Sequence, residues 1–138
     1  DMRTKVFELP GKLKVEWDPE AKAIVDTWTT YSVSVEEFRE AVLVRGVAYA
    51  KAHGGRAWIV DAHTAHGTFS QEIQTLIATE VFPTFVEIGI KYFMSINSAN
   101  ALTKMTVNQY TTQAGPAGLT VLNGSSAEGA LTWLLAHP

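Results

Sequence analysis

The segment that most restricts the fold of this chain is a short apolar run, Arg56–Ala62 (RAWIVDA), between two segments with helical periodicity. A run of this length and composition is typical of a strand buried on both faces of a sheet. Strands that are separated by helices usually run parallel and are joined by right-handed crossovers. The run therefore predicts the central strand of an α/β domain.

The segment before this strand, residues 34–55 (SVEEFREAVLVRGVAYAKAHGG), predicts a helix. Ser34 and Glu37 have the spacing of a capping box at its start, and Gly54 suits a left-handed residue at its end. Gly46 lies inside the helix, where a glycine is mildly unfavourable.

The segment after the strand predicts a second helix, capped by Thr68 or Ser70. Its apolar stripe consists of Ile73, Leu76, Ile77 and Val81. Pro83 should break or kink this helix, with a further turn running on to Gly89.

The remaining elements complete an alternating order. Residues 12–30 predict an antiparallel hairpin around Asp18-Pro19-Glu20, because Asp-Pro starts a turn between two alternating apolar runs. Further along, we expect strands at 91–97 and 118–123 and helices at 98–113 and 125–138. Ser125 and Glu128 suggest a second capping box. The prediction is one α/β domain over residues 1–138, of order β-β-α-β-α-β-α-β-α, with helices packed on a mixed sheet that begins with an antiparallel hairpin.

Composition narrows the class of protein. With 46% hydrophobic and 18% charged residues, the 138-residue chain should form a globular core. It has no cysteine, so disulfides, thiolate metal sites and cysteine nucleophiles are excluded.

The net charge is −3 and no basic stripe occurs, so we expect no nucleic-acid partner. No apolar run approaches the ~20 residues of a membrane span, and no signal peptide is recognisable, so we expect a cytoplasmic protein.

Two stretches, WIVDAHTAHGTFSQEIQTLIATEVFPTFVEIGIKYFMSI and the final SSAEGALTWLL, resemble the STAS-like group related to sporulation anti-sigma-factor antagonists. In that group a Trp-hydrophobic-Val-Asp strand precedes a polar loop and a helix that ends near Pro-x-x-x-Glu-x-Gly. A closing Ala-x-x-Trp-Leu helix completes the pattern, and the resemblance covers roughly Leu13 to Ala136. It implies a STAS-like fold and a regulatory role. In the antagonists, phosphorylation of a serine in an Asp-Ser pair of this loop switches partner binding, but this loop contains no such pair.

The loop after the central strand holds the spacing Asp61-x-His63-x-x-His66. Asp61 should lie at the carboxyl end of the strand, where open α/β sheets place their ligand crevices. Three such ligands would suit zinc or iron with an open coordination position, but the spacing matches no specific metal signature. We therefore expect no metal and no cofactor: Asp61 should fix the turn by accepting hydrogen bonds, and both histidines should be solvated.

Nucleophilic catalysis and nucleotide binding receive less support. Ser70 or Thr68 with His66 and Asp61 has the composition of a serine-histidine-acid triad, but the G-x-S-x-G elbow is missing. Helix capping explains both hydroxyls. The glycine pairs match neither a P-loop nor a dinucleotide fingerprint.

We therefore expect a regulatory domain that binds a protein partner or forms a homodimer. Its binding or regulatory residues are predicted to be Asp61, His63, Thr64, His66, Thr68 and Ser70. The hydroxyl residues among them are the candidates for a phosphorylation switch, since phosphate is favoured at a helix N-terminus.

The alternative is a small-molecule-binding protein or an enzyme, with a pocket at the carboxyl ends of the strands. Asp61, His63 and His66 would supply its polar groups. Its apolar wall would come from Tyr92, Met94 and Tyr110 or from the hairpin tryptophans, Trp17 and Trp28. Either tryptophan could also be exposed, whereas Trp58 and Trp133 are expected in the core.

Overall fold

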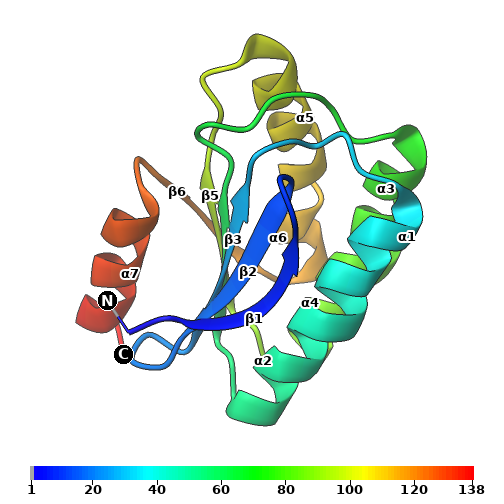
Figure 1. Ribbon diagram of the computed structural model, residues 1–138. Helices are drawn as coiled ribbons and strands as arrows, with labels where there is room; N and C mark the ends of the chain where they lie inside the picture. The colour runs from blue at the N-terminus through cyan, green and yellow to red at the C-terminus, as the bar shows by residue number, and fades with distance from the viewer. Residues whose placement is uncertain (1) are drawn as a thin grey trace.

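A computed structural model describes residues 2–138 and shows one six-stranded sheet in the order β1-β2-β3-β4-β5-β6 (Figure 1). The strands are β1 (Thr4–Leu9), β2 (Leu13–Asp18), β3 (Ala23–Trp28), β4 (Ala57–Asp61), β5 (Tyr92–Ile96) and β6 (Thr120–Gly124). The first three strands are antiparallel, and β3 to β6 run parallel. The predicted α/β fold, a mixed sheet that carries an N-terminal antiparallel hairpin, is confirmed.

Helical segments cover both faces of the sheet unequally. The segments on one face are α1 (Val35–Phe38), η1 (Arg39–Gly46), α2 (Val47–His53), α3 (Gln71–Leu76), η2 (Ile77–Val81), α4 (Phe82–Glu87), α5 (Ala101–Thr111) and α6 (Ala114–Ala117). Among the helices of residues 2–138, α7 (Ala127–Ala136) alone lies on the opposite face (Figure 1). Each face therefore has its own hydrophobic core, and the larger one lies under α1 to α6.

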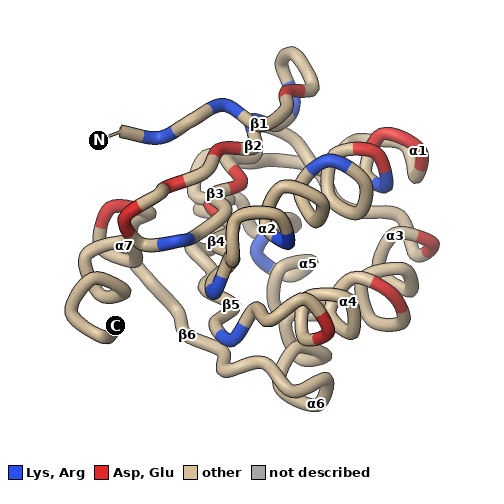
Figure 2. Tube along the Cα trace, turned by 90° about the horizontal axis from the view of Figure 1, so that it is seen from below, with Lys and Arg blue, Asp and Glu red and all other residues tan. Residues whose placement is uncertain are grey.

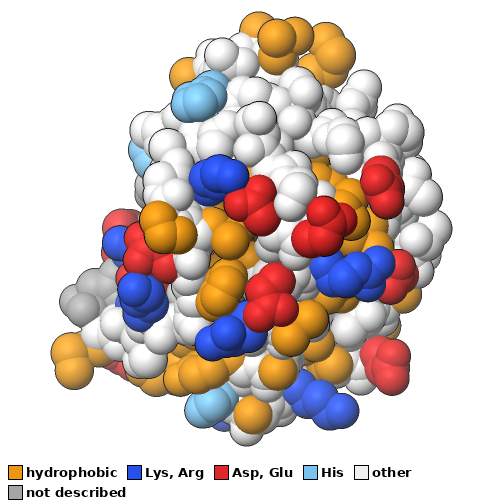
Figure 3. Space-filling model, turned by 45° about the vertical axis from the view of Figure 1, so that its right-hand side comes forward, with side chains coloured by type: hydrophobic (Ala, Val, Ile, Leu, Met, Phe, Trp, Pro, Cys, Tyr) orange, Lys and Arg blue, Asp and Glu red, His pale blue; other side chains and the backbone are white. Residues whose placement is uncertain are grey.

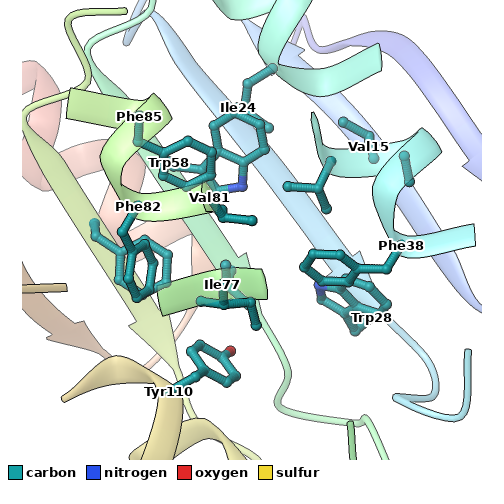
Figure 4. Close-up of a cluster of buried hydrophobic side chains, with 14 of the residues drawn as sticks. Val15, Ile24, Trp28, Phe38, Trp58, Ile77, Val81, Phe82, Phe85 and Tyr110 are labelled. Atoms are coloured by element: carbon teal, nitrogen blue, oxygen red, sulfur yellow. The ribbon is translucent and has the colours of Figure 1, made fainter. Parts of the chain in front are cut away.

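Strand register assigns residues to these cores. Ile24, Trp58 and Phe93 stand side by side on β3, β4 and β5 and face the larger core. The next row, Val25, Ile59 and Met94, faces α7. This alternation explains why β4 is apolar throughout: both of its faces are covered. Figure 4 shows aromatic and aliphatic side chains from the strands and the helices meeting in the larger core.

The first long helix begins and ends where the sequence predicts. Ser34 Oγ accepts a hydrogen bond from the Glu37 amide, the Glu37 carboxylate accepts one from the Ser34 amide, and Gly54 is left-handed at φ 68°. The middle of the helix, η1, is π-helical, a form that periodicity did not predict. Gly46 ends η1 at a point where an added Cβ would lie 2.7 Å from Trp58 Cη2. Glycine is required there because the indole packs directly on the backbone.

The second helical segment runs from Gln71 to Glu87 through α3, η2 and α4. The cap is Ser70, whose Oγ accepts a hydrogen bond from the Ile73 amide at 3.2 Å. Pro83 does not end the helix: it follows η2 in the first turn of α4, and the helix continues. The π-helical turn before it changes the hydrogen-bond pattern where proline has no N–H to donate.

The structure differs from the sequence analysis in one strand that was missed and in one helix cap that was wrongly predicted. β1 was not predicted, because the register shift between Lys5 and Phe7 breaks the alternation that marks a strand. It precedes the predicted hairpin of β2 and β3 and forms an edge of the sheet. The C-terminal helix is capped by Ser126, whose Oγ accepts from the Gly129 amide at 3.0 Å, instead of by Ser125 with Glu128. Two adjacent serines make the cap ambiguous by one residue in sequence.

The tryptophans are packed in the interior to different extents. Trp17 and Trp28, either of which could have been exposed, are both buried in the larger core. Trp58 is buried as predicted, and it stacks on Phe85 with a ring-centroid distance of 4.1 Å. Trp133 is partly buried against the smaller core.

Candidate functional site

Asp61 and His63 form a bonded pair at the carboxyl end of β4. Asp61 Oδ1 lies 2.6 Å from His63 Nδ1 and 3.1 Å from the His63 amide nitrogen. The Asp61 side chain is 9% exposed, whereas that of His63 is 57% exposed. Because the carboxylate accepts, the Nδ1 atom carries a hydrogen and Nε2 faces away from the pair. This arrangement leaves Nε2 able to accept a proton, donate one or bind a ligand.

The backbone of the loop is held firmly, so the loop presents a defined surface. The His66 carbonyl accepts a hydrogen bond from the Tyr31 amide at 2.8 Å. From the other side, Ser98 Oγ donates to the Ala65 carbonyl at 2.7 Å and Thr103 Oγ1 donates to the Gly67 carbonyl at 2.6 Å. The loop is therefore bonded both to the segment after β3 and to the N-terminal turn of α5.

His66 is not part of the bonded pair. Its ring is exposed, and its backbone forms the bridge to Thr30. Within residues 2–138, no group of three or more His, Cys, Asp or Glu side chains is arranged to hold a metal ion. The three side chains of the Asp61-x-His63-x-x-His66 spacing are thus not brought together.

The hydroxyl residues of the loop lie on its outer surface. Thr64, Thr68 and Ser70 are exposed, and Ser70 is occupied as the cap of α3. The triad considered from the sequence is not assembled, since Asp61 bonds His63 and Ser70 bonds the Ile73 amide.

A polar cleft of about 320 Å³ opens beside the pair on the α7 face of the sheet. Its walls are Arg3, Lys14, Glu16, Thr27, Asp61, His63, Ser126, Ala127 and Glu128. The apolar wall expected from Tyr92, Met94 and Tyr110 is not part of this cleft. The sequence does not predict that Lys14 and Thr27 lie near Asp61, because this proximity follows from the register of β2, β3 and β4, which places the three residues in one row.

A second feature, missed in the sequence, is a carboxyl group in the larger core. Asp26 is 2% exposed; its Oδ2 accepts a hydrogen bond from Trp58 Nε1 at 2.9 Å, and its Oδ1 has no partner. It lines a small cavity of about 30 Å³, which otherwise has mainly apolar and aromatic walls. Burial raises the pKa of Asp26 to about 7, partly offset by the indole hydrogen bond. Its burial could have been predicted from the sequence, because the alternation along β3 puts Asp26 on the same face as Ile24 and Trp28.

An exposed apolar pair lies on α5, next to the loop. Leu102 is 63% exposed and Met105 is 56% exposed, and their spacing of three residues places them on one side of the helix. Thr103, which bonds the loop at Gly67, stands between them in sequence. Hydrophobic side chains gather at the top of the molecule, where α5 begins (Figures 1 and 3).

Comparison of the chain with protein-family models, with curated proteins and with solved structures found no match in any of the three. The STAS-like assignment therefore stays a hypothesis that rests on the sequence motifs. Among residues 2–138, no helix combines the length and the apolar character needed to cross a bilayer.

Proposed function

We propose that the chain is a regulatory domain of STAS-like type that binds a protein partner without catalysing a reaction. Its contact surface consists of the loop residues 62–70 and the exposed pair Leu102 and Met105 of α5. The observation that carries the proposal is the exposure of these two large apolar side chains beside a loop whose backbone is bonded in place. Apolar side chains rimmed by polar groups are a common feature of protein-binding surfaces.

The loop supplies the polar rim and a site for regulation. Ser70 stands at the N-terminus of the helical segment that continues to Glu87, where free backbone amides favour a phosphate group. Phosphorylation there would replace the hydroxyl cap by a group of about two negative charges at the edge of the contact surface. Thr64 and Thr68 are exposed alternatives. The cytoplasmic location expected from the sequence is part of this proposal.

The test compares partner capture by matched surface variants. Leu102→Asp with Met105→Asp changes the contact surface, and Leu135→Asp changes an equally exposed leucine, at 52%, on α7. We expect the unmodified chain and Leu135→Asp to capture the same proteins from the source cell. The double variant should no longer capture them. Equal capture by all three proteins, or no specific capture by any, would show that the proposal is wrong.

The switch has its own test. After incubation with source-cell lysate and ATP, modified peptides are mapped by mass spectrometry, and a phosphate is expected on Ser70, Thr68 or Thr64. Thr64→Ala, Thr68→Ala and Ser70→Ala are then combined in one variant. Unchanged partner binding by this variant, with and without ATP, would remove the switch from the proposal and leave the contact surface standing.

A further inference from the structure

The cleft on the α7 face has a floor made by three adjacent strands. Lys14 pairs with Thr27, and Thr27 pairs with Asp61, so the three residues form one row across β2, β3 and β4. Neighbouring strands lie about 4.8 Å apart, which puts the backbones of Lys14 and Asp61 roughly 10 Å from each other. Long side chains that converge from this separation can enclose a ligand only a few atoms across.

Acidic residues gather around β2, β3 and α7 (Figure 2), and some of the charged side chains of the cleft are paired with each other while others are not. Arg3 pairs with Glu128 at 2.9 Å and contacts Glu16 at 3.5 Å, so these two carboxylates share one guanidinium and keep a net negative charge. The side chain of Lys14 makes no hydrogen bond or ion pair with any residue in the described range 2–138, although its charge, after that of Lys5, contributes to lowering the pKa of Glu8. Glu8, which lies opposite Lys14 on β1, pairs instead with Lys5 at 2.9 Å.

The negative counterpart is the second carboxylate oxygen of Asp61. Oδ1 is taken by His63, while Oδ2 has no hydrogen-bond partner within residues 2–138. The side chain is nine-tenths buried and lines the cleft. Oδ2 is not among the fully buried oxygens without a partner, so it is accessible from the cleft, where a carboxylate oxygen can accept a hydrogen bond from a charged donor of a ligand. Besides Arg3 and the two glutamates that share it, the cleft thus offers one cation, Lys14, and one anion, Asp61, on the strands to either side of Thr27.

We propose that this cleft binds a small zwitterion of the free α-amino acid class, with the ligand carboxylate on Lys14 and its ammonium group on Asp61. A volume of about 320 Å³ lies at the lower end of the range of ligand pockets, which suits a ligand of this size. The first turn of α7, at Ser126 and Ala127, adds partial positive charge on the same side. His63 also lines the cleft, and its Nε2, which is not used in the bond to Asp61, is available to a polar side chain of the ligand. Neither Leu102 nor Met105 lines the cleft, so this site is separate from the proposed contact surface.

The first experiment measures binding of standard L-α-amino acids by thermal shift, followed by calorimetry of those that raise the melting temperature. We expect at least one to bind at millimolar concentration. Its decarboxylated amine and its deaminated acid, which each lack one of the two charges, should bind at least about tenfold more weakly. Absence of binding across the whole panel, or equal binding of the amine or the acid, would overturn the proposal.

The second experiment locates the site with matched variants. Lys14→Gln removes the proposed partner of the carboxylate, and Lys104→Gln removes an exposed lysine on α5 that does not line the cleft. We expect Lys14→Gln to weaken binding by about tenfold or more and Lys104→Gln to leave it unchanged. Unaltered affinity in Lys14→Gln contradicts the proposal.

Asp61→Asn tests the other charge and should weaken binding in the same way, with the circular dichroism spectrum as a check on folding. If this variant does not fold, amide chemical-shift changes in the unmodified protein decide. We expect the bound amino acid to shift the amides of Thr27, Asp61, His63 and Ser126. Shifts confined to residues outside the cleft overturn the proposal.

Discussion

At the scale of single residues, Asp26 makes stability depend on pH. Its pKa rises from 3.8 to about 7 because the carboxyl group is buried among apolar side chains. The folded state therefore holds a proton that the unfolded state releases, and the free energy of unfolding falls as pH rises from about 4 to about 7. At 1.36 kcal/mol per pKa unit, the whole effect is roughly 4 kcal/mol.

Asp26→Asn removes this titration and keeps an acceptor for the Trp58 indole. We expect urea denaturation of the unmodified protein to show a loss of roughly 2–3 kcal/mol between pH 5 and pH 8, and the variant to lose most of this slope. The control, Glu20→Gln, changes an exposed carboxylate and should retain the slope. An unmodified protein with no pH dependence in this range, or an Asn variant with the same slope, would contradict the burial argument.

At the scale of elements, the helix from Val35 to His53 depends on a glycine that helix propensity disfavours. Gly46 lies under Trp58, and Trp58 is held by its stack on Phe85 and its hydrogen bond to Asp26. In an open helical position, alanine stabilises by about 1 kcal/mol relative to glycine. Here a Cβ would overlap the indole, so the indole or the helix must shift.

We therefore expect Gly46→Ala to lower the free energy of unfolding by about 1–3 kcal/mol. Gly115→Ala is the matched control, since nothing lies within 4 Å of an added Cβ on Gly115 in α6. Alanine gains helix propensity at this position but also precedes Pro116, which disfavours a helical residue with a Cβ, so we expect a change of less than about 1 kcal/mol in either direction. Denaturation curves of the two variants measure the change in the free energy of unfolding. A Gly46→Ala protein as stable as the unmodified chain would be inconsistent with tight packing at η1.

At the scale of the whole molecule, the sheet has one edge at β1 and the other at β6. β3, β4 and β5 each have strand neighbours on both sides. Edge strands with charged residues and a bulge, such as Lys5 and Glu8 in β1, are poor templates for further pairing. We expect native-state hydrogen exchange to be slowest in β4 and clearly faster in β1 and β6.

Repeating the exchange experiment over a range of protein concentrations tests the homodimer expected as one alternative. Protection of β6 or β1 that increases with concentration, together with a dimer in sedimentation, would indicate that an edge is covered by a second copy. Concentration-independent exchange with fast edges would argue against edge-to-edge pairing.

The elements that depend on local chemistry can be predicted from the sequence. The apolar run of β4, the capping box at Ser34 and Glu37 and the left-handed Gly54 were all predictable, because periodicity, caps and glycine conformations act over a few residues. The same reasoning led to the parallel order of the central strands. It failed at β1, where a bulge interrupts the alternation, and it placed the α7 cap one residue early.

Which side chains meet depends on long-range packing, which cannot be predicted from local sequence patterns. Asp61 and His63 are close in sequence and were expected in one loop. Their hydrogen bond, however, depends on the conformation of that loop, which is held by Tyr31 and Thr103. The same conformation keeps His66 apart from the pair. The cleft joins side chains from β2, β3, β4 and α7, and the Asp26 cavity joins strands to helices. Such groups arise from strand register and from the face on which each helix packs. Register and helix placement are long-range properties, because they depend on how the two hydrophobic cores pack. A local sequence pattern does not predict them.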